Sequence, residues 1–145
     1  MVEIKKYSLI KPNIETPFHI DFDWWKQHDS NWRVYLQGCL CQEHSDSFTS
    51  LDSDVLIDQI DPVTAEVRQI DGLQHVVMNH CALQIDFISD KTSLVDAVFR
   101  TFLANGNKPL SPLELEEKTQ RSGITILRTI GGQQVYKGIR PLQKS

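Results

Sequence analysis

Apolar residues recur at helical spacing most clearly in the stretch that follows Ser93. Steps of one, three and four residues place one set of side chains on a single helical face. This set is Leu94, Val95, Val98, Phe99, Phe102 and Leu103. Ser93 and Asp96 form an approximate capping box, and Asn105-Gly106 is typical of a helix end. The pattern predicts an amphipathic helix between Ser93 and Gly106.

Two shorter helices and a strand are predicted after this long helix. The Ser-Pro-Leu-Glu string at 111–114 combines a cap, a proline at the first helical position and an acid that reaches back. It predicts a helix that ends near Thr119. Another helix is predicted at Ile124–Ile130, after Ser122 and before a Gly-Gly pair. Alternating residues then predict a strand at Gln134–Ile139.

The N-terminal region mixes extended and helical patterns. Residues 1–20 contain two prolines and are interpreted as an extended arm or an edge strand. Helical spacing of aromatic residues and leucines predicts a helix at Ile20–Gln42, although the weak helix formers at His28–Asn31 leave a break open. The polar stretch at 45–54 is interpreted as a loop.

The middle of the chain predicts a β-hairpin followed by a helix. Val55–Ile60 and Thr64–Ile70 alternate on either side of Asp61-Pro62, which is typical of a turn. The run at Leu73–Leu83 predicts a helix. Together these patterns predict an α+β fold of two small parts. Residues 1–90 form a mixed helix and hairpin part, and residues 91–145 form a helical part that ends in a strand.

Composition and charge narrow the class of protein. Of 145 residues, 40% are hydrophobic and 23% are charged, which excludes disordered and fibrous classes. No apolar run is long enough for a membrane span, and the first residues lack a signal-peptide core, so we expect a cytoplasmic protein. Residues 1–100 carry 8 Lys and Arg against 16 Asp and Glu, a balance of −8. Residues 101–145 carry 7 against 3, a balance of +4, which gives the net charge of −4.

The C-terminal third resembles a winged-helix domain of the helix-turn-helix class. The resemblance rests on the order of elements in SLVDAVFRTFLANGNKPLSPLELEEKTQRSGITILRTIGGQQVYKGI, within residues 91–142. It implies that the second short helix enters the major groove of DNA, while a β-hairpin wing touches the backbone. It also implies core positions at Leu113 or Leu115, Ile124, Leu127 and Ile130.

The same resemblance implies a nucleic-acid surface. Arginine pairs with guanine edges or phosphates, threonine hydroxyls bond to either, and lysine neutralises phosphates. The residues expected to make these contacts are Arg121, Thr125, Arg128, Thr129, Lys137 and Arg140. The partner would be duplex DNA or RNA, and a homodimer would present two recognition helices.

A zinc site is a second candidate. Cys41 and His44 have the spacing of two ligands on one helical turn, and His80-Cys81 lie on the helix after the hairpin. Four protein ligands would make this a closed structural site that joins the two helices. The alternative is that the cysteines, including Cys39, are small buried apolar residues.

The sequence patterns leave three classes of function open. The leading interpretation is a non-enzymatic, DNA-binding, transcription-associated protein. The second is an adaptor that docks within a larger complex through the same C-terminal unit. The third is a small metal-dependent enzyme, which would need an open position on its metal. Catalytic signals are weak, because the chain contains no Gly-rich phosphate loop.

Overall fold

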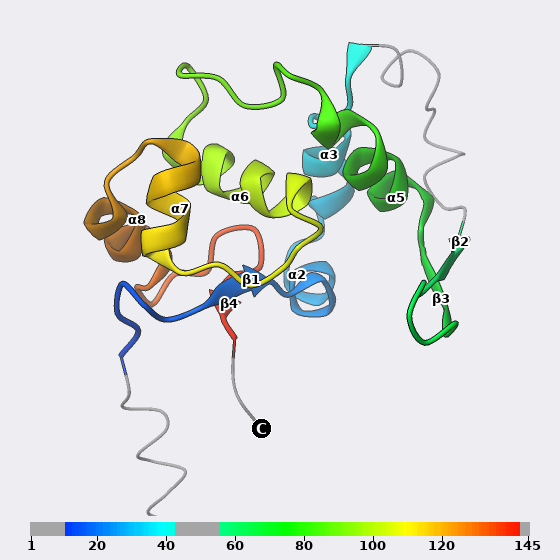
Figure 1. Cartoon of the computed structure of the whole chain (residues 1–145), viewed down its shortest axis with the longest axis horizontal. Coiled ribbons are helices and arrows are strands. Elements are labelled where there is room, and N and C mark those ends of the chain that lie inside the picture. The colour runs from blue at the N-terminus through cyan, green and yellow to red at the C-terminus, as the bar shows by residue number, and fades with distance from the viewer. Residues whose placement is uncertain (1–10, 43–55, 143–145) are drawn as a thin grey trace, which may run out of the picture.

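The computed structural model describes residues 11–42 and 56–142. Within these ranges it contains six α-helices, one 3-10 helix and two antiparallel pairs of strands, which confirms the α+β class (Figure 1). The elements are β1 (Phe18–Ile20), α2 (Phe22–His28), α3 (Trp32–Gln37), β2 (Leu56–Ile60), β3 (Val67–Asp71), α5 (Gly72–Asn79), η2 (Cys81–Leu83), α6 (Leu94–Ala104), α7 (Pro112–Thr119), α8 (Gly123–Ile130) and β4 (Ile139–Pro141). The predicted loop at 45–54 and the first half of the predicted arm lie outside the described residues.

The three C-terminal helices begin at the predicted caps. The Ser93 hydroxyl accepts a hydrogen bond from the Asp96 amide at the start of α6. Ser111 and Glu114 form a complete capping box on α7, and the Ser122 hydroxyl caps α8. Each cap satisfies amide groups that have no partner within the helix, so short polar motifs suffice to fix these starts.

The predicted single helix at Ile20–Gln42 is wrong, because the chain forms β1, α2 and α3 in this region. The break falls within His28–Asn31, as the alternative allowed. Asp29 leaves the helical conformation, and its carboxylate accepts hydrogen bonds from the Asn31 amide and from Trp25 Nε1, at 2.9 and 3.1 Å. A side chain that bonds its own backbone competes with helix formation, so α2 ends here.

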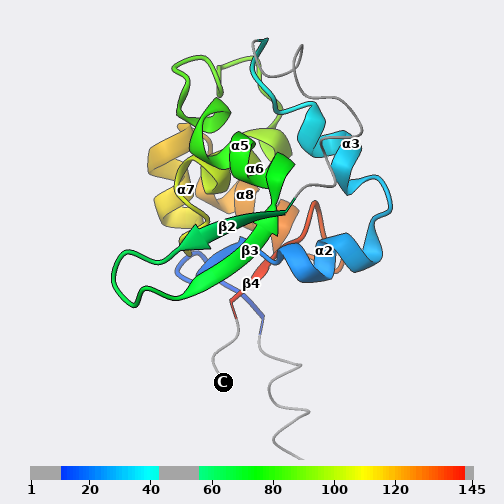
Figure 2. The ribbon, with the colours of Figure 1, turned by 90° about the vertical axis from the view of Figure 1, so that its right-hand side faces the viewer.

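The hairpin is confirmed, and the helix after it is shorter than predicted. β2 pairs with β3 from Leu56 opposite Asp71 to Ile60 opposite Val67. This hairpin projects from the body of the molecule (Figures 1 and 2). The predicted helix at Leu73–Leu83 divides into α5 and η2, because His80 departs from helical geometry between them.

The other pair of strands joins the two ends of the described chain. β1 pairs with β4, with Phe18 opposite Pro141 and Ile20 opposite Ile139. Phe18 also forms a bridge with Leu110, which lies between α6 and α7. Figure 1 shows both strands beneath α6 and α7. The N-terminal segment therefore lies between two C-terminal segments, so the expected strand is present but is not at an edge.

The predicted strand at Gln134–Ile139 is wrong, since β4 begins only at its last residue. Lys137 and Gly138 both adopt positive φ, at 53° and 76°, and turn the chain away from an extended path. Gly138 approaches α2 so closely that an added Cβ would lie 2.7 Å from Trp25 Cβ. Its carbonyl accepts a hydrogen bond from the Asp21 amide. Glycine is required at this point both by φ and by the contact.

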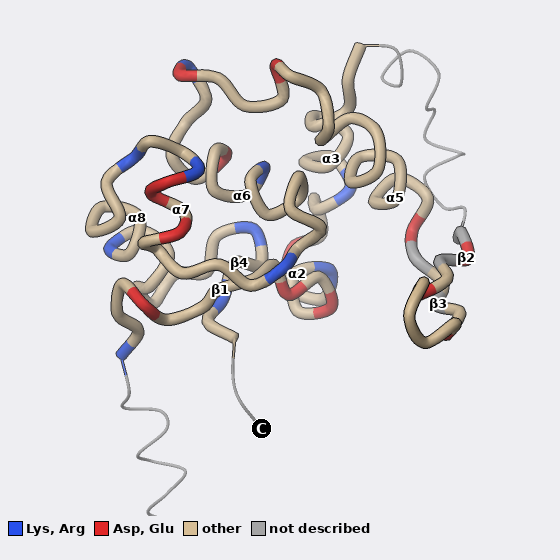
Figure 3. The backbone as a smooth tube through the Cα atoms, viewed as in Figure 1, with Lys and Arg blue, Asp and Glu red and all other residues tan. Residues whose placement is uncertain are grey.

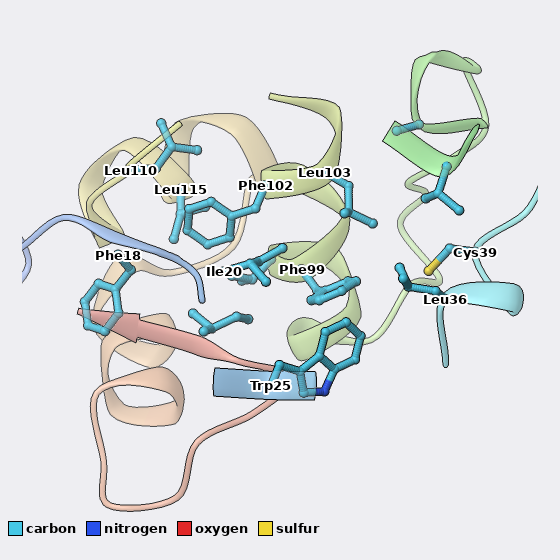
Figure 4. Packing of buried hydrophobic residues seen from close by; sticks show 14 of the residues in the cluster. Phe18, Ile20, Trp25, Leu36, Cys39, Phe99, Phe102, Leu103, Leu110 and Leu115 are labelled. Atoms are coloured by element: carbon cyan, nitrogen blue, oxygen red, sulfur yellow. The ribbon is translucent and has the colours of Figure 1, made fainter. Parts of the chain in front are cut away.

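One hydrophobic core draws on both predicted parts, residues 1–90 and 91–145. Trp25 and Phe99 meet at its centre with ring centroids 5.2 Å apart (Figure 4). Phe18 and Ile20 fill the side beneath α6, and Leu115 fixes α7 against Phe102. Burial of these large side chains is the main source of stability.

Most of the implied core positions in α7 and α8 are confirmed, with one error. Leu115 and Ile130 are buried and Leu127 packs against the core. Ile124 is 56% exposed, and Ile126 takes its place in the core. Leu127 and Ile130 have helical spacing both with Ile124 and with Ile126, so the pattern alone does not decide which isoleucine faces inward.

The Asn107 side chain bonds to the backbone of β1, and we predict that this contact stabilises the fold. Its side chain accepts from the Ile20 amide and donates to the Ile20 carbonyl, both at 2.9 Å. Replacement by glycine removes both bonds and should lower the free energy of unfolding by about 1–3 kcal/mol. Replacement by alanine should cost about 1 kcal/mol more, because residue 107 has a φ of 58°.

Urea unfolding at constant pH measures these changes. Asn79→Ala is a suitable control, because that side chain is exposed and bonds only within α5. Wild-type stability in Asn107→Gly would show that the two bonds to β1 contribute nothing.

Candidate functional site

The outward face of α8 brings together three of the residues predicted to contact nucleic acid. Ile126 and Ile130 anchor the helix in the core. Thr125 and Arg128 are exposed on the other side, and Thr129 is partly exposed beside them. The Thr129 hydroxyl donates to the Thr125 carbonyl at 2.9 Å, which leaves its lone pairs for a further partner.

Arg121 lies at the turn between α7 and α8 and holds the chain that precedes α6. Its guanidinium donates to the Thr92 carbonyl at 2.6 Å and to the Ser89 carbonyl at 3.4 Å. A guanidinium has five N–H donors, so two such bonds leave others for a phosphate. These bonds hold the segment that precedes α6 against the turn between α7 and α8.

Lys137 and Arg140 lie against the N-terminal helices. The Lys137 ammonium lies 4.2 Å from the ring centroid of Tyr35. Arg140 pairs with the Asp21 carboxylate at 3.2 Å and lies over the ring of Trp24. These contacts place both cations beside α2 and α3. Thr125, Arg128 and Thr129 instead share a face of α8.

Acidic side chains lie close to α8. Figure 3 shows acidic positions along α7, next to the basic positions at the turn that leads to α8. The Glu116 carboxylate accepts a hydrogen bond from the Gly123 amide at 2.7 Å and so supports the first turn of α8. Glu117 is exposed on the same helix. Their negative charge reduces the attraction of this surface for a polyanion.

A polar cleft of about 510 Å³ is a further candidate that the sequence patterns did not predict. It lies among α2, α3, β3 and α5. Its lining includes Lys26, Trp32, Arg33, Gln69, Asp71 and Gln74. These residues are far apart in sequence and form no motif, so only the fold brings them together.

Three charged residues of the cleft, Lys26, Arg33 and Asp71, have partners within the protein. The Lys26 ammonium bonds to Gln74 Oε1 at 3.1 Å and lies 4.7 Å from the Trp32 ring centroid. Burial lowers the pKa of Lys26, and the carboxylates of Asp71 and Asp23 oppose that change. Arg33 donates to Asp71 at 2.6 Å. These three side chains are therefore committed to contacts within the protein.

Asp71 joins this cleft to the scaffold. One of its carboxylate oxygens caps α5 by accepting from the Leu73 and Gln74 amides. The other accepts from Arg33 on α3, and the side chain is only 4% exposed. A buried carboxylate needs such compensation, so Asp71 fixes the end of the hairpin to two helices.

Two of the four predicted zinc ligands are neighbours. The Cys81 thiol donates to Cys41 Sγ across 3.5 Å. His80 is exposed, with its Nε2 3.4 Å from Nε2 of the Gln84 side chain, and His44 lies outside the described residues. Among residues 11–42 and 56–142, no group of three or more potential ligands has the geometry of a metal site. Zinc binding stays a prediction.

Comparison with known proteins adds no identification. No protein-family model, curated protein or solved structure matches the chain. Within the described ranges, no helix is long and apolar enough to cross a membrane.

The buried thiol of Cys39 predicts a loss of stability at alkaline pH. Burial raises the pKa of Cys39 from 9.0 to about 11. The folded state therefore holds this proton more tightly, and stability falls as pH rises from 9 toward 11. For one such thiol the expected loss between pH 8 and 10.5 is about 2 kcal/mol.

Urea unfolding of wild type and Cys39→Ala at both pH values tests this expectation. The variant should lose about 2 kcal/mol less than wild type over the same interval. Comparing the change, not the absolute stability, removes the cost of the cavity that alanine leaves. An identical loss in both proteins would exclude Cys39 as the source.

Proposed function

We propose that the chain is a non-enzymatic nucleic-acid-binding protein, of the transcription-associated kind, that contacts duplex DNA with the outward face of α8. The observation that carries the proposal is the presentation of α8. The helix is capped by Ser122 and anchored by Ile126 and Ile130, which leaves Thr125 and Arg128 exposed. A rigid helix with polar residues on its outer face is suited to a DNA groove.

The order of elements supports this proposal. A long helix, two short capped helices and a strand follow one another as α6, α7, α8 and β4. This is the order on which the resemblance to winged-helix domains rests. The chain departs from that pattern at its end, because β4 pairs with β1 and not with a second strand of a wing.

The chemistry predicts weak and salt-sensitive binding. Arg128 can pair with a phosphate or a guanine edge, and the Thr125 hydroxyl can bond to either. Arg121, Lys137 and Arg140 already make contacts within the protein, so each adds less than an uncommitted cation would. Few phosphates would be neutralised, which gives a modest dependence on salt. A homodimer would strengthen binding by presenting two copies of α8.

Arg128→Glu is expected to weaken binding to a labelled duplex by about tenfold or more, because one phosphate contact is lost and a repulsion is added. Fluorescence anisotropy at low and physiological salt measures the affinity. Lys108→Glu is the matched control, since it makes the same charge change at an exposed loop residue that precedes α7. Equal loss in both variants, or no loss in either, would contradict the proposed role of α8.

Docking to a protein is the second candidate, and exposed apolar residues favour it. Ile124 and Leu113 lie near the adjoining starts of α8 and α7, and are 56% and 44% exposed. Val63 at the turn of the hairpin is 89% exposed, and Ile60 and Val67 beside it are also exposed. Apolar residues grouped on a surface are typical of contact sites between proteins.

Ile124→Arg separates the two candidates. The change adds a cation and removes an apolar side chain one helical turn from Arg128 on the exposed side of α8. Nucleic-acid binding predicts that affinity for the duplex is kept or increased, because a further phosphate contact becomes available. Protein docking predicts that duplex binding is absent in wild type and that a crosslinked partner complex is lost in the variant. Thr125→Ser, which keeps the hydroxyl and the charge, serves as the control for both measurements.

A further inference from the structure

Cys41 and Cys81 form a pair of thiols that the fold brings together from distant parts of the chain. Cys41 follows α3, and Cys81 is the first residue of η2. Their sulfur atoms lie 3.5 Å apart, and neither cysteine forms a disulfide in this structure. A disulfide bond is about 2.05 Å long, so the two sulfurs need to approach by only about 1.5 Å.

The two thiols differ in access to solvent. Cys41 is partly exposed, whereas Cys81 is fully buried. The Cys81 thiol donates a hydrogen bond to Cys41 Sγ. An oxidant arriving from solvent therefore meets Cys41 first, with Cys81 directly behind it.

We propose that Cys41 and Cys81 are a thiol–disulfide exchange site, which reacts with a small disulfide such as oxidised glutathione and closes to an intramolecular disulfide. Cys41 Sγ, as the thiolate, attacks one sulfur of the small disulfide and releases one glutathione thiolate. The product is a mixed disulfide on Cys41. Cys81 then loses its proton and attacks Cys41 Sγ, which releases the second glutathione.

The reaction balances without a further reactant. Two protein thiols and one oxidised glutathione give one protein disulfide and two reduced glutathione molecules. The two protons of the protein thiols end on the glutathione thiolates. The protein is oxidised by two electrons, and the small disulfide is reduced by two.

The closed bond would link the segment after α3 to η2. Because 40 residues separate the two cysteines, the bond would restrict the unfolded chain over a long loop. The oxidised protein should therefore need more urea to unfold than the reduced protein. This site is independent of α8, so the inference does not rest on the proposed nucleic-acid function.

Cys39 provides an internal test of selectivity. It lies two residues from Cys41 in sequence, and its side chain is buried in the core (Figure 4). In an unfolded chain nothing holds Cys81 next to Cys41, so crosslinks that include Cys39 also become accessible. A native preference for Cys81 therefore reports the folded geometry, and a preference for Cys39 reports an unfolded chain.

The experiment equilibrates the reduced full chain, without oxygen, in mixtures of reduced and oxidised glutathione. Remaining thiols are alkylated after acid quenching, and peptide mass spectrometry locates the bonds. We expect the loss of two hydrogen atoms, alkylation of Cys39 alone and a Cys41–Cys81 crosslink. The same treatment in urea should give a mixture of crosslinks that includes Cys39. Cys39→Ala should keep the native crosslink, and Cys81→Ser should stop at glutathione on Cys41.

Three results would overturn the proposal. The first is full alkylation of all three cysteines at every glutathione ratio in native buffer. The second is a native crosslink that joins Cys39 to either other cysteine. The third is one zinc ion per purified chain that is released in Cys81→Ser, because thiols that hold a metal are ligands and not an exchange site.

Discussion

The contact between Trp25 and Phe99 is the interaction on which the arrangement of the other elements depends. Their ring centroids lie 5.2 Å apart, and Tyr35 packs edge-on against both rings. Gly138 must approach Trp25 closely for β4 to reach β1. The same tryptophan donates to Asp29, the residue at which α2 ends. One aromatic side chain therefore joins α2, α3, α6 and the C-terminal strand.

The presentation of α8 follows from this core. The buried face of α6 holds α7 through Leu115 and α8 through Ile126, and the N-terminal segment closes the core from below. With its inner face fixed, α8 exposes Thr125 and Arg128. The same packing draws Lys137 and Arg140 toward the aromatic residues of α2 and α3. The core thus determines both what α8 offers to a partner and which cations are committed elsewhere.

Local sequence signals predicted where helices begin, whereas long-range contacts determined the pairing of the strands and the buried face of α8. The caps at Ser93, Ser111 and Ser122 act within one helical turn, so sequence alone located these starts. The pairing of β1 with β4 joins segments over a hundred residues apart and has no local signature. Ile124 was predicted in the core in place of Ile126 because two helical faces fit the same apolar spacing.

For the candidate sites the same distinction holds. The zinc-site hypothesis grouped Cys41 with Cys81, and these two residues are neighbours in the structure, whereas the cleft around Lys26 has no motif. Urea unfolding followed both by tryptophan fluorescence and by circular dichroism tests the central claim of one shared core most directly. All three tryptophans lie in α2 and α3, whereas circular dichroism also reports α6, α7 and α8. We predict one coincident transition. Loss of the tryptophan signal before the helical signal would contradict the shared core.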